Sequence, residues 1–231
     1  MTEMKLAILG ASMPHLPLYL KAKEMGLKTY CIAWAEGAFC RDYADHFCDI
    51  SITEKEKIAE LCLKEGISGI VSNALEPAVP TAAYVSEKCG FNGISYSAAL
   101  RAVNKKAMRE RVQETRPCDQ PAFAVLRPGD PVPEIFPAII KPTDSSCSNG
   151  VSKVSSASEI EAAVIRARTA SASGEILMEE FIDGREISVE SISFHGRHHV
   201  LAITDKETTG APYFVETAHH EPSSLPAPVQ D

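Results

Sequence analysis

Short apolar runs alternate with amphipathic segments along the first part of the chain. Several of the apolar runs end at a glycine, as Leu6–Leu9 does at Gly10. The expected strands cover 6–9, 29–33 and 67–71, and the expected helices cover 16–25, 54–65 and 80–89. Because short apolar strands that alternate with helices pair side by side in one direction, the pattern predicts a parallel α/β sheet with helices on both faces.

The pattern changes after Gly93. One basic helix is expected over 97–115, and a stretch rich in proline follows it. Proline confines a chain to turns, strand ends and sheet edges. The next expected elements are strands over 122–126, 138–141 and 175–181 and a helix over 158–170, with Ser158 as its N-cap and Glu161 completing the cap.

Alternation with a period of two returns in the last part of the chain. Apolar residues alternate over 186–194 and 199–204, with a turn at 195–197 between them, which predicts an antiparallel hairpin. From Thr208 the chain is expected to be loop-like, and 221–231 to form no stable element. Three regions are therefore expected, at 1–95, 96–183 and 184–231.

Composition excludes some classes of function. The formal net charge of −8 over 231 residues argues against nucleic acid or an anionic membrane as the main partner, since both need a basic face. The seven cysteines are scattered, as is typical of reduced thiols, and no apolar run is long enough for a membrane span. We therefore expect a soluble, cytoplasmic protein that acts on small molecules.

An apolar run ends at Lys141 and passes into a loop of small polar residues. The candidate phosphate-binding groups of the loop are Ser145, Ser146, Ser148, Asn149 and Gly150. A lysine at a strand end can bind phosphate oxygens as a mobile charge, while hydroxyl, amide and backbone N–H groups donate to others. A solvated turn is the other interpretation. The loop is not a P-loop, because no GxxxxGK[ST] segment occurs.

Glu179 and Glu180 are neighbours near the end of another apolar run. Since neighbouring residues of a strand point to opposite faces, one carboxylate can face a cleft and accept a hydrogen bond from an exocyclic amine. Backbone groups of Glu180 and Ile182 can then pair with the edge of a base, and Phe181 can supply an apolar contact. The alternative is an edge strand with two solvated carboxylates.

Three motifs follow one another in the chain: Asn104-Lys105-x-x-Met108, Lys141-Pro142 with its serine and glycine loop, and Met178-Glu-Glu-Phe-Ile-x-Gly-x-Glu186. In this order they resemble the ATP-grasp superfamily, in particular the branch near biotin carboxylase and the large chain of carbamoyl-phosphate synthetase. The resemblance implies a fold in three parts: a Rossmann-like domain, an α+β lid and the first part of a catalytic lobe.

The resemblance also implies ATP as the ligand. The implied contacts are Lys105 and Lys141 with the phosphates, Glu179 with the adenine amine, the Glu180 and Ile182 backbone with the base edge, and Glu186 with the ribose hydroxyls. The 145–150 loop would be the flexible lid over the triphosphate. In the family, ATP activates a carboxylate as an acyl phosphate for attack by an amine or another nucleophile, so a small carboxylate or amine substrate is expected. A homodimer is one assembly that the resemblance allows.

Magnesium is implied as well, with ligands in the family on strands beyond the base-contacting segment. The acidic residues after Glu186 are Glu190, Asp205, Glu207, Glu216, Glu221 and Asp231, and none has the expected spacing. Because Mg²⁺ supplies the main charge stabilisation in phosphoryl transfer, we expect a C-terminally truncated ligase that is inactive alone and binds nucleotide weakly at most.

Two other functions stay open. A non-catalytic nucleotide-binding or regulatory module would need no metal ligands. A Rossmann-type oxidoreductase would need a dinucleotide fingerprint, but Gly10–Pro14 lacks its second and third glycines. The histidines at 195, 198, 199, 219 and 220 are interpreted as structural or surface residues, because a zinc site needs three or four ligands with supporting contacts.

Overall fold

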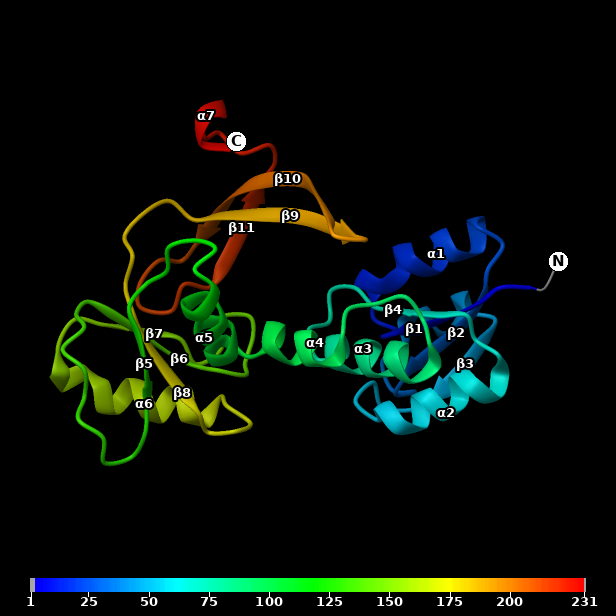
Figure 1. Ribbon diagram of the computed structural model, residues 1–231, viewed down its shortest axis with the longest axis horizontal. Helices are drawn as coiled ribbons and strands as arrows, with labels where there is room; N and C mark the ends of the chain where they lie inside the picture. The colour runs from blue at the N-terminus through cyan, green and yellow to red at the C-terminus, as the bar shows by residue number, and fades with distance from the viewer. Residues whose placement is uncertain (1–2, 231) are drawn as a thin grey trace. The chain divides into compact units, whose positions relative to one another are not determined.

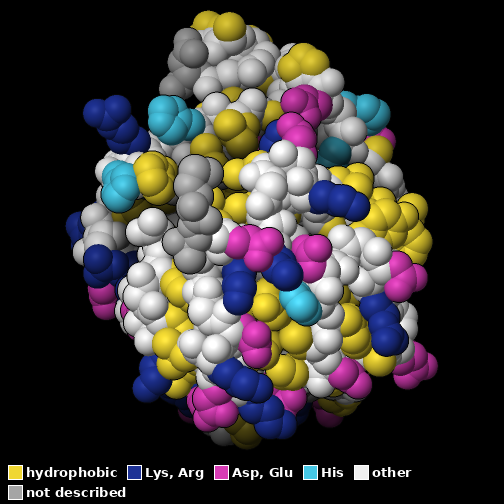
Figure 2. Space-filling view, turned by 90° about the vertical axis from the view of Figure 1, so that its right-hand side faces the viewer, with side chains coloured by type: hydrophobic (Ala, Val, Ile, Leu, Met, Phe, Trp, Pro, Cys, Tyr) yellow, Lys and Arg dark blue, Asp and Glu magenta, His cyan; other side chains and the backbone are white. Residues whose placement is uncertain are grey.

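The computed structural model describes residues 3–230 and divides the chain into two compact units, Met1–Met108 and Arg109–Asp231. Each unit has its own sheets and its own core. The expected region limits at 95 and 183 stay predictions. Within residues 3–230, no helix combines the length and the apolar character needed to cross a membrane. Acidic and basic side chains intermingle on the face seen in Figure 2.

The first unit contains the expected parallel sheet with helices on both faces (Figure 1). Its strands are β1 (Lys5–Leu9), β2 (Lys28–Ala33), β3 (His46–Asp49) and β4 (Gly69–Val71), in the order β3-β2-β1-β4. Helix α1 (Leu16–Glu24) covers one face, and α2 (Lys55–Glu65) and α3 (Ala78–Cys89) cover the other. Alternation along the strands sends Leu9 and Ile32 toward α2 and α3, and Ile8 and Cys31 toward α1.

The single basic helix expected over 97–115 is wrong, because the chain forms two helices there. Helix α4 (Tyr96–Val103) ends before Asn104, whose backbone is extended, and α5 (Lys105–Thr115) begins after it. The Asn104 side chain accepts a hydrogen bond from the Ala107 N–H at 2.9 Å, which caps the first turn of α5. A residue that caps a new helix in this way cannot continue the preceding one.

The second unit begins with an antiparallel sheet and one covering helix. The strands are β5 (Phe123–Leu126), β6 (Ala138–Pro142), β7 (Ser152–Val154) and β8 (Ile176–Glu180), in the order β5-β8-β6-β7. Helix α6 (Ile160–Thr169) packs on one face. The core between them consists of Ala138, Ile140, Val154, Ile160, Ala163, Ala167, Ile176 and Met178.

The expected cap of α6 at Ser158 is wrong. A short 3-10 turn (Ala157–Glu159) precedes the helix, and α6 begins only at Ile160. The Glu159 carboxylate closes this turn by accepting a hydrogen bond from the Ser155 N–H at 2.9 Å. Ser158 therefore lies inside the turn, where it cannot act as the N-cap.

A second sheet confirms the predicted hairpin and extends it. Its strands are β9 (Ile187–Phe194), β10 (Arg197–Thr208) and β11 (Glu216–His220), in the order β11-β10-β9. His195 and Gly196 form the turn with positive φ angles of 49° and 75°. Strand β11 and the short helix α7 (Ala227–Gln230) lie where only loop was expected. The polar β11 is held by pairing with β10, which its own sequence does not reveal.

Candidate functional site

The register of the β5–β8 sheet places Lys141 and Glu179 on the same face. Ile139 on β6 lies opposite Glu179 on β8, and Lys141 lies opposite Leu177. Paired residues of neighbouring strands share a face, and alternate residues of one strand do too. The intervening residues Ile140 and Met178 point into the core beneath α6. The face away from α6 therefore carries Lys141 and Glu179, together with Ile139 and Leu177.

Glu179 is the centre of an ion cluster on that face. Its carboxylate lies 2.6 Å from the Lys141 ammonium and 2.7 Å from the Arg109 Nε, with a second Arg109 contact at 3.3 Å. Glu179 is only 4% exposed. Arg109 comes from α5, where the Gln120 side chain also donates to its backbone carbonyl at 3.2 Å. Sequence reasoning included Arg109 in a basic helix but assigned it no role at the site.

The two cations keep this buried carboxylate ionised. Burial alone would raise the pKa of Glu179, but the hydrogen bond from Arg109 and the charge of Lys141 outweigh burial and hold that pKa below its ordinary value. The one carboxylate thus holds the Lys141 ammonium and the Arg109 guanidinium together on this face of the sheet.

The acidic pair diverges as the sequence predicted. Glu180 is exposed, and its carboxylate accepts a hydrogen bond from the Ala122 N–H at 3.2 Å. The Glu180 N–H donates to the Ala122 carbonyl at 2.8 Å, so this N–H is already used within the sheet. The Phe181 ring lies under the Lys153 ammonium, 3.6 Å from the ring centroid, and Ile182 is 59% exposed. The strand end thus presents an aromatic ring and an exposed apolar side chain.

The 145–150 loop is anchored at several points. The Asp144 carboxylate, just before the loop, accepts hydrogen bonds from the Ser171 hydroxyl and the Ser173 N–H, both at 2.7 Å. Ser148 donates its hydroxyl to the Phe214 carbonyl at 2.8 Å, which ties the loop to the chain before β11. Gly150 has a φ of 78°, and a Cβ placed there would lie 2.7 Å from the Ala170 Cβ. Only glycine fits this turn without displacing Ala170, the residue that follows α6.

Glu186 belongs to a separate ion cluster of the second unit. Its carboxylate lies 3.4 Å from the Lys206 ammonium, which is also 2.7 Å from Glu216. Burial would lower the pKa of Lys206, but its hydrogen bond to Glu216 raises that pKa above the ordinary value. The Lys206 N–H donates to the Glu186 carbonyl at 3.0 Å, so the two residues are fixed to each other by backbone and side chain.

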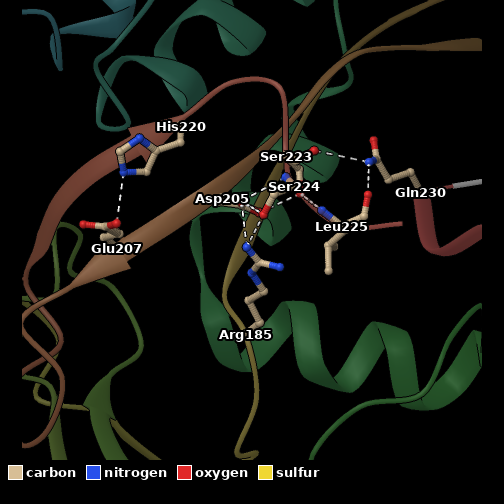
Figure 3. A network of polar contacts seen from close by, with 8 residues as sticks. All are labelled: Arg185, Asp205, Glu207, His220, Ser223, Ser224, Leu225 and Gln230. Atoms are coloured by element: carbon tan, nitrogen blue, oxygen red, sulfur yellow. Dashed lines mark hydrogen bonds and ion pairs between the residues drawn. The ribbon is translucent and has the colours of Figure 1, made fainter. Parts of the chain in front are cut away.

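An adjacent network supports the strand that follows Glu186 (Figure 3). The Asp205 carboxylate accepts hydrogen bonds from the Ser223 hydroxyl at 2.6 Å and the Ser224 N–H at 2.9 Å, and it pairs with Arg185 at 2.9 Å. These contacts, led by the Ser223 hydroxyl, lower the pKa of Asp205 to about 2. The network fixes Arg185, and with it the start of β9.

Lys105 is the first residue of α5 and belongs to the first unit, so its predicted approach to the same phosphate as Lys141 stays a prediction. Within residues 3–230, no three His, Cys, Asp or Glu side chains are grouped to hold a metal ion. His198 and His220 instead contact Ser193 and Glu207 at the surface, at 2.6 Å and 3.0 Å. Asp231 lies outside the described residues.

Solved structures with the same fold include ATP-grasp ligases. The L-amino acid ligase from Bacillus licheniformis superimposes with a TM-score of 0.81 at 23% identity, over 99% of this chain and 57% of that chain. The biotin carboxylase domain dimer of 2-oxoglutarate carboxylase from Hydrogenobacter thermophilus, in complex with MgADP, ADP and bicarbonate, gives 0.76 at 17% identity, over 98% and 55%. These likenesses define the fold as that of the ATP-grasp class.

Sequence comparison points to the same class. Residues 134–231, less than half of the chain, match the model of the ATP-grasp domain. Formate-dependent phosphoribosylglycinamide formyltransferase from Wolinella succinogenes is 28% identical over 187 residues, which make up 78% of this chain and 48% of that protein. The chain thus spans about half the length of this curated relative.

Proposed function

We propose that the second unit binds ATP, and that a protein of the relatives' length uses it to join a carboxylate to an amine or thiol through an acyl phosphate. The observation that carries the proposal is the buried Glu179 carboxylate held between Lys141 and Arg109. This arrangement fixes a lysine at a strand end beside a serine and glycine loop. The family match over 134–231 supports the same ligand.

Each side chain has a physical role in this proposal. Lys141 contacts phosphate oxygens. Glu179, predicted to accept a hydrogen bond from the adenine amine, instead holds the lysine in place, because Arg109 and Lys141 engage both of its oxygens; this lowers the entropy lost when ATP binds. Phe181 and Ile182 supply apolar surface for adenine at the end of β8. The roles predicted for Lys105 with the phosphates, for the Glu180 backbone and Ile182 with the base edge, and for Glu186 with the ribose hydroxyls are part of the proposal.

Magnesium accompanies ADP in one structure of the same fold. Among residues 3–230 no three potential ligands are grouped, so we assign no magnesium ligand and derive no step through the ion. What these residues themselves can do is bind and orient the nucleotide. Positioning and charge neutralisation account for most of the protein's contribution to phosphoryl transfer.

Titration calorimetry of the full chain with ATP tests the proposal. Lys141→Ala should weaken ATP binding by at least about tenfold, since it removes a charge-assisted contact. Lys64→Ala is the matched control, because Lys64 is 80% exposed and lies on α2 of the first unit. Equal ATP affinity in the wild-type, Lys141→Ala and Lys64→Ala proteins, with all three folded, would contradict the assignment.

A further inference from the structure

A pocket of about 390 Å³ lies in the first unit, whereas the ion cluster described above belongs to the second. It is formed by the segments that follow the carboxyl ends of β1, β2, β3 and β4, which contribute Gly10, Trp34, Thr53 and Leu75. Ligands of open parallel sheets bind at this edge, because the connecting loops there leave a crevice. The position alone makes the pocket a candidate site, and its lining indicates what it would bind.

His15 supplies one of the polar groups of the pocket wall. The side chain is 2% exposed, and its Nε2 is buried without a hydrogen-bond partner among the described residues. The imidazole lies directly over Gly10, since a Cβ on Gly10 would be 2.2 Å from Nε2. A buried nitrogen without a partner is costly, and such a group in a pocket wall is commonly satisfied by a ligand or an ordered water.

The contacts of the other ring nitrogen define what Nε2 can accept. His15 Nδ1 lies 2.8 Å from the Ser12 hydroxyl and 3.3 Å from the Ser12 carbonyl. A carbonyl oxygen can only accept, so both contacts are hydrogen bonds together only when Nδ1 carries the proton. Nε2 of the neutral ring is then a bare acceptor. The pocket therefore calls for a ligand with a hydrogen-bond donor.

Charge and apolar surface complete the description of the ligand. Among the described residues, the lining contains no lysine or arginine, and Glu36 is its one charged residue. The rest is largely apolar, and it includes Trp34, which is 69% exposed at the rim. An anion would lose water here without gaining a cation, whereas an ammonium group would gain the Glu36 carboxylate.

We propose that this pocket binds an organic amine with a small apolar body, using His15 and Glu36 as hydrogen-bond acceptors and Trp34 as an apolar wall. This site does not depend on ATP binding in the second unit. It also disfavours a phosphorylated sugar, although the curated relative carries a phosphoribosyl compound in its name.

The chain's one tryptophan provides the measurement, because Trp34 lies at the pocket itself. Tryptophan fluorescence of the full chain is titrated with 2-phenylethylamine, with phenylacetate and with ribose 5-phosphate. The amine should give a saturable change, and the two anions should give none. His15→Leu should weaken amine binding about fivefold and Glu36→Gln about threefold, because each removes one acceptor.

The variants separate the possible results. Glu60→Gln, an exposed carboxylate on α2 outside the pocket, should bind the amine like the wild type. Glu36 is exposed, so its variant keeps the test valid even if His15→Leu fails to fold. Three results would each overturn the proposal: no saturable change with the amine, binding of phenylacetate or ribose 5-phosphate as tight as the amine, or unaltered affinity in folded His15→Leu and Glu36→Gln.

Discussion

Glu179 shows how much a single position can determine. It is a buried carboxylate at the end of an apolar strand, and two cations from different elements satisfy it. Removing one partner of a buried ion cluster leaves the other charges without compensation. The same residue therefore contributes to folding stability and to the charge of the proposed ATP site.

We expect Glu179→Gln to lower the free energy of unfolding by about 3 kcal/mol at neutral pH. The folded-state pKa of Glu179 is below its ordinary value, so its contribution is complete above the unfolded pKa of about 4.3 and is lost as pH falls through the folded pKa. Urea unfolding at a series of pH values should show this acid-dependent loss in the wild type and a shallower dependence in the variant.

The control for this measurement is Glu114→Gln on the same helix as Arg109. Glu114 pairs with Arg111 at 3.2 Å, but both side chains are more than half exposed, at 66% and 59%. An exposed pair contributes about 1 kcal/mol at most. A loss in Glu179→Gln no larger than in Glu114→Gln would show that the buried cluster does not stabilise the unit.

At the scale of elements, the 145–150 loop depends on its packing against α6. Gly150→Ala should lower the free energy of unfolding by about 3 kcal/mol, because the backbone has a positive φ and the added Cβ meets Ala170 at 2.7 Å. Gly129→Ala is the matched control: its φ is 87°, but nothing lies within 4 Å of the added Cβ. That variant should lose only about 1 kcal/mol.

Thermal and urea unfolding of both variants check this comparison. If the two alanine variants lose the same stability, strain at positive φ accounts for the whole effect, and the contact with Ala170 contributes nothing. ATP affinity of the folded Gly150→Ala protein is a second measurement, and it should be reduced because Ser148 and Asn149 belong to the same turn.

The local sequence pattern was sufficient to predict the elements whose apolar residues recur at a clear spacing. Strands β1, β2, β6 and β8 and the β9–β10 hairpin were predicted because their apolar residues face a core or alternate clearly. Strands β3, β7 and β11 were missed, since they are short and exist through pairing with β2, β6 and β10. The break at Asn104 was missed because a capping asparagine and a helical asparagine look alike in sequence.

The site was predicted in part for the same reason. A lysine at a strand end and a Glu-Glu pair are visible in sequence, but their contact follows from the register of β6 and β8. Arg109 reaches Glu179 across 70 positions of the chain, and only the fold reveals that. The available signal was indirect: a carboxylate buried at the end of an apolar strand needs a compensating cation.

For the whole molecule, the sheet of each unit should respond to its own ligand. Hydrogen exchange of the full chain should slow with ATP at 138–150 and 176–182 in the second unit, while β1 and β2 stay unchanged. The amine proposed for the first unit should give the opposite pattern. Equal protection of both units by either ligand would contradict two independent sites.

The alternation of side chains along β8 also makes a shift in its pairing register energetically unfavourable. Met178 points toward α6 and Glu179 toward Lys141, so a slip by one residue would exchange them. The Glu179 carboxylate would be buried in the apolar core without counter-ions, and the Met178 thioether would lie beside two cations. A misaligned β8 would thus be destabilised on both faces of the sheet, so the sequence of this strand itself favours the native register.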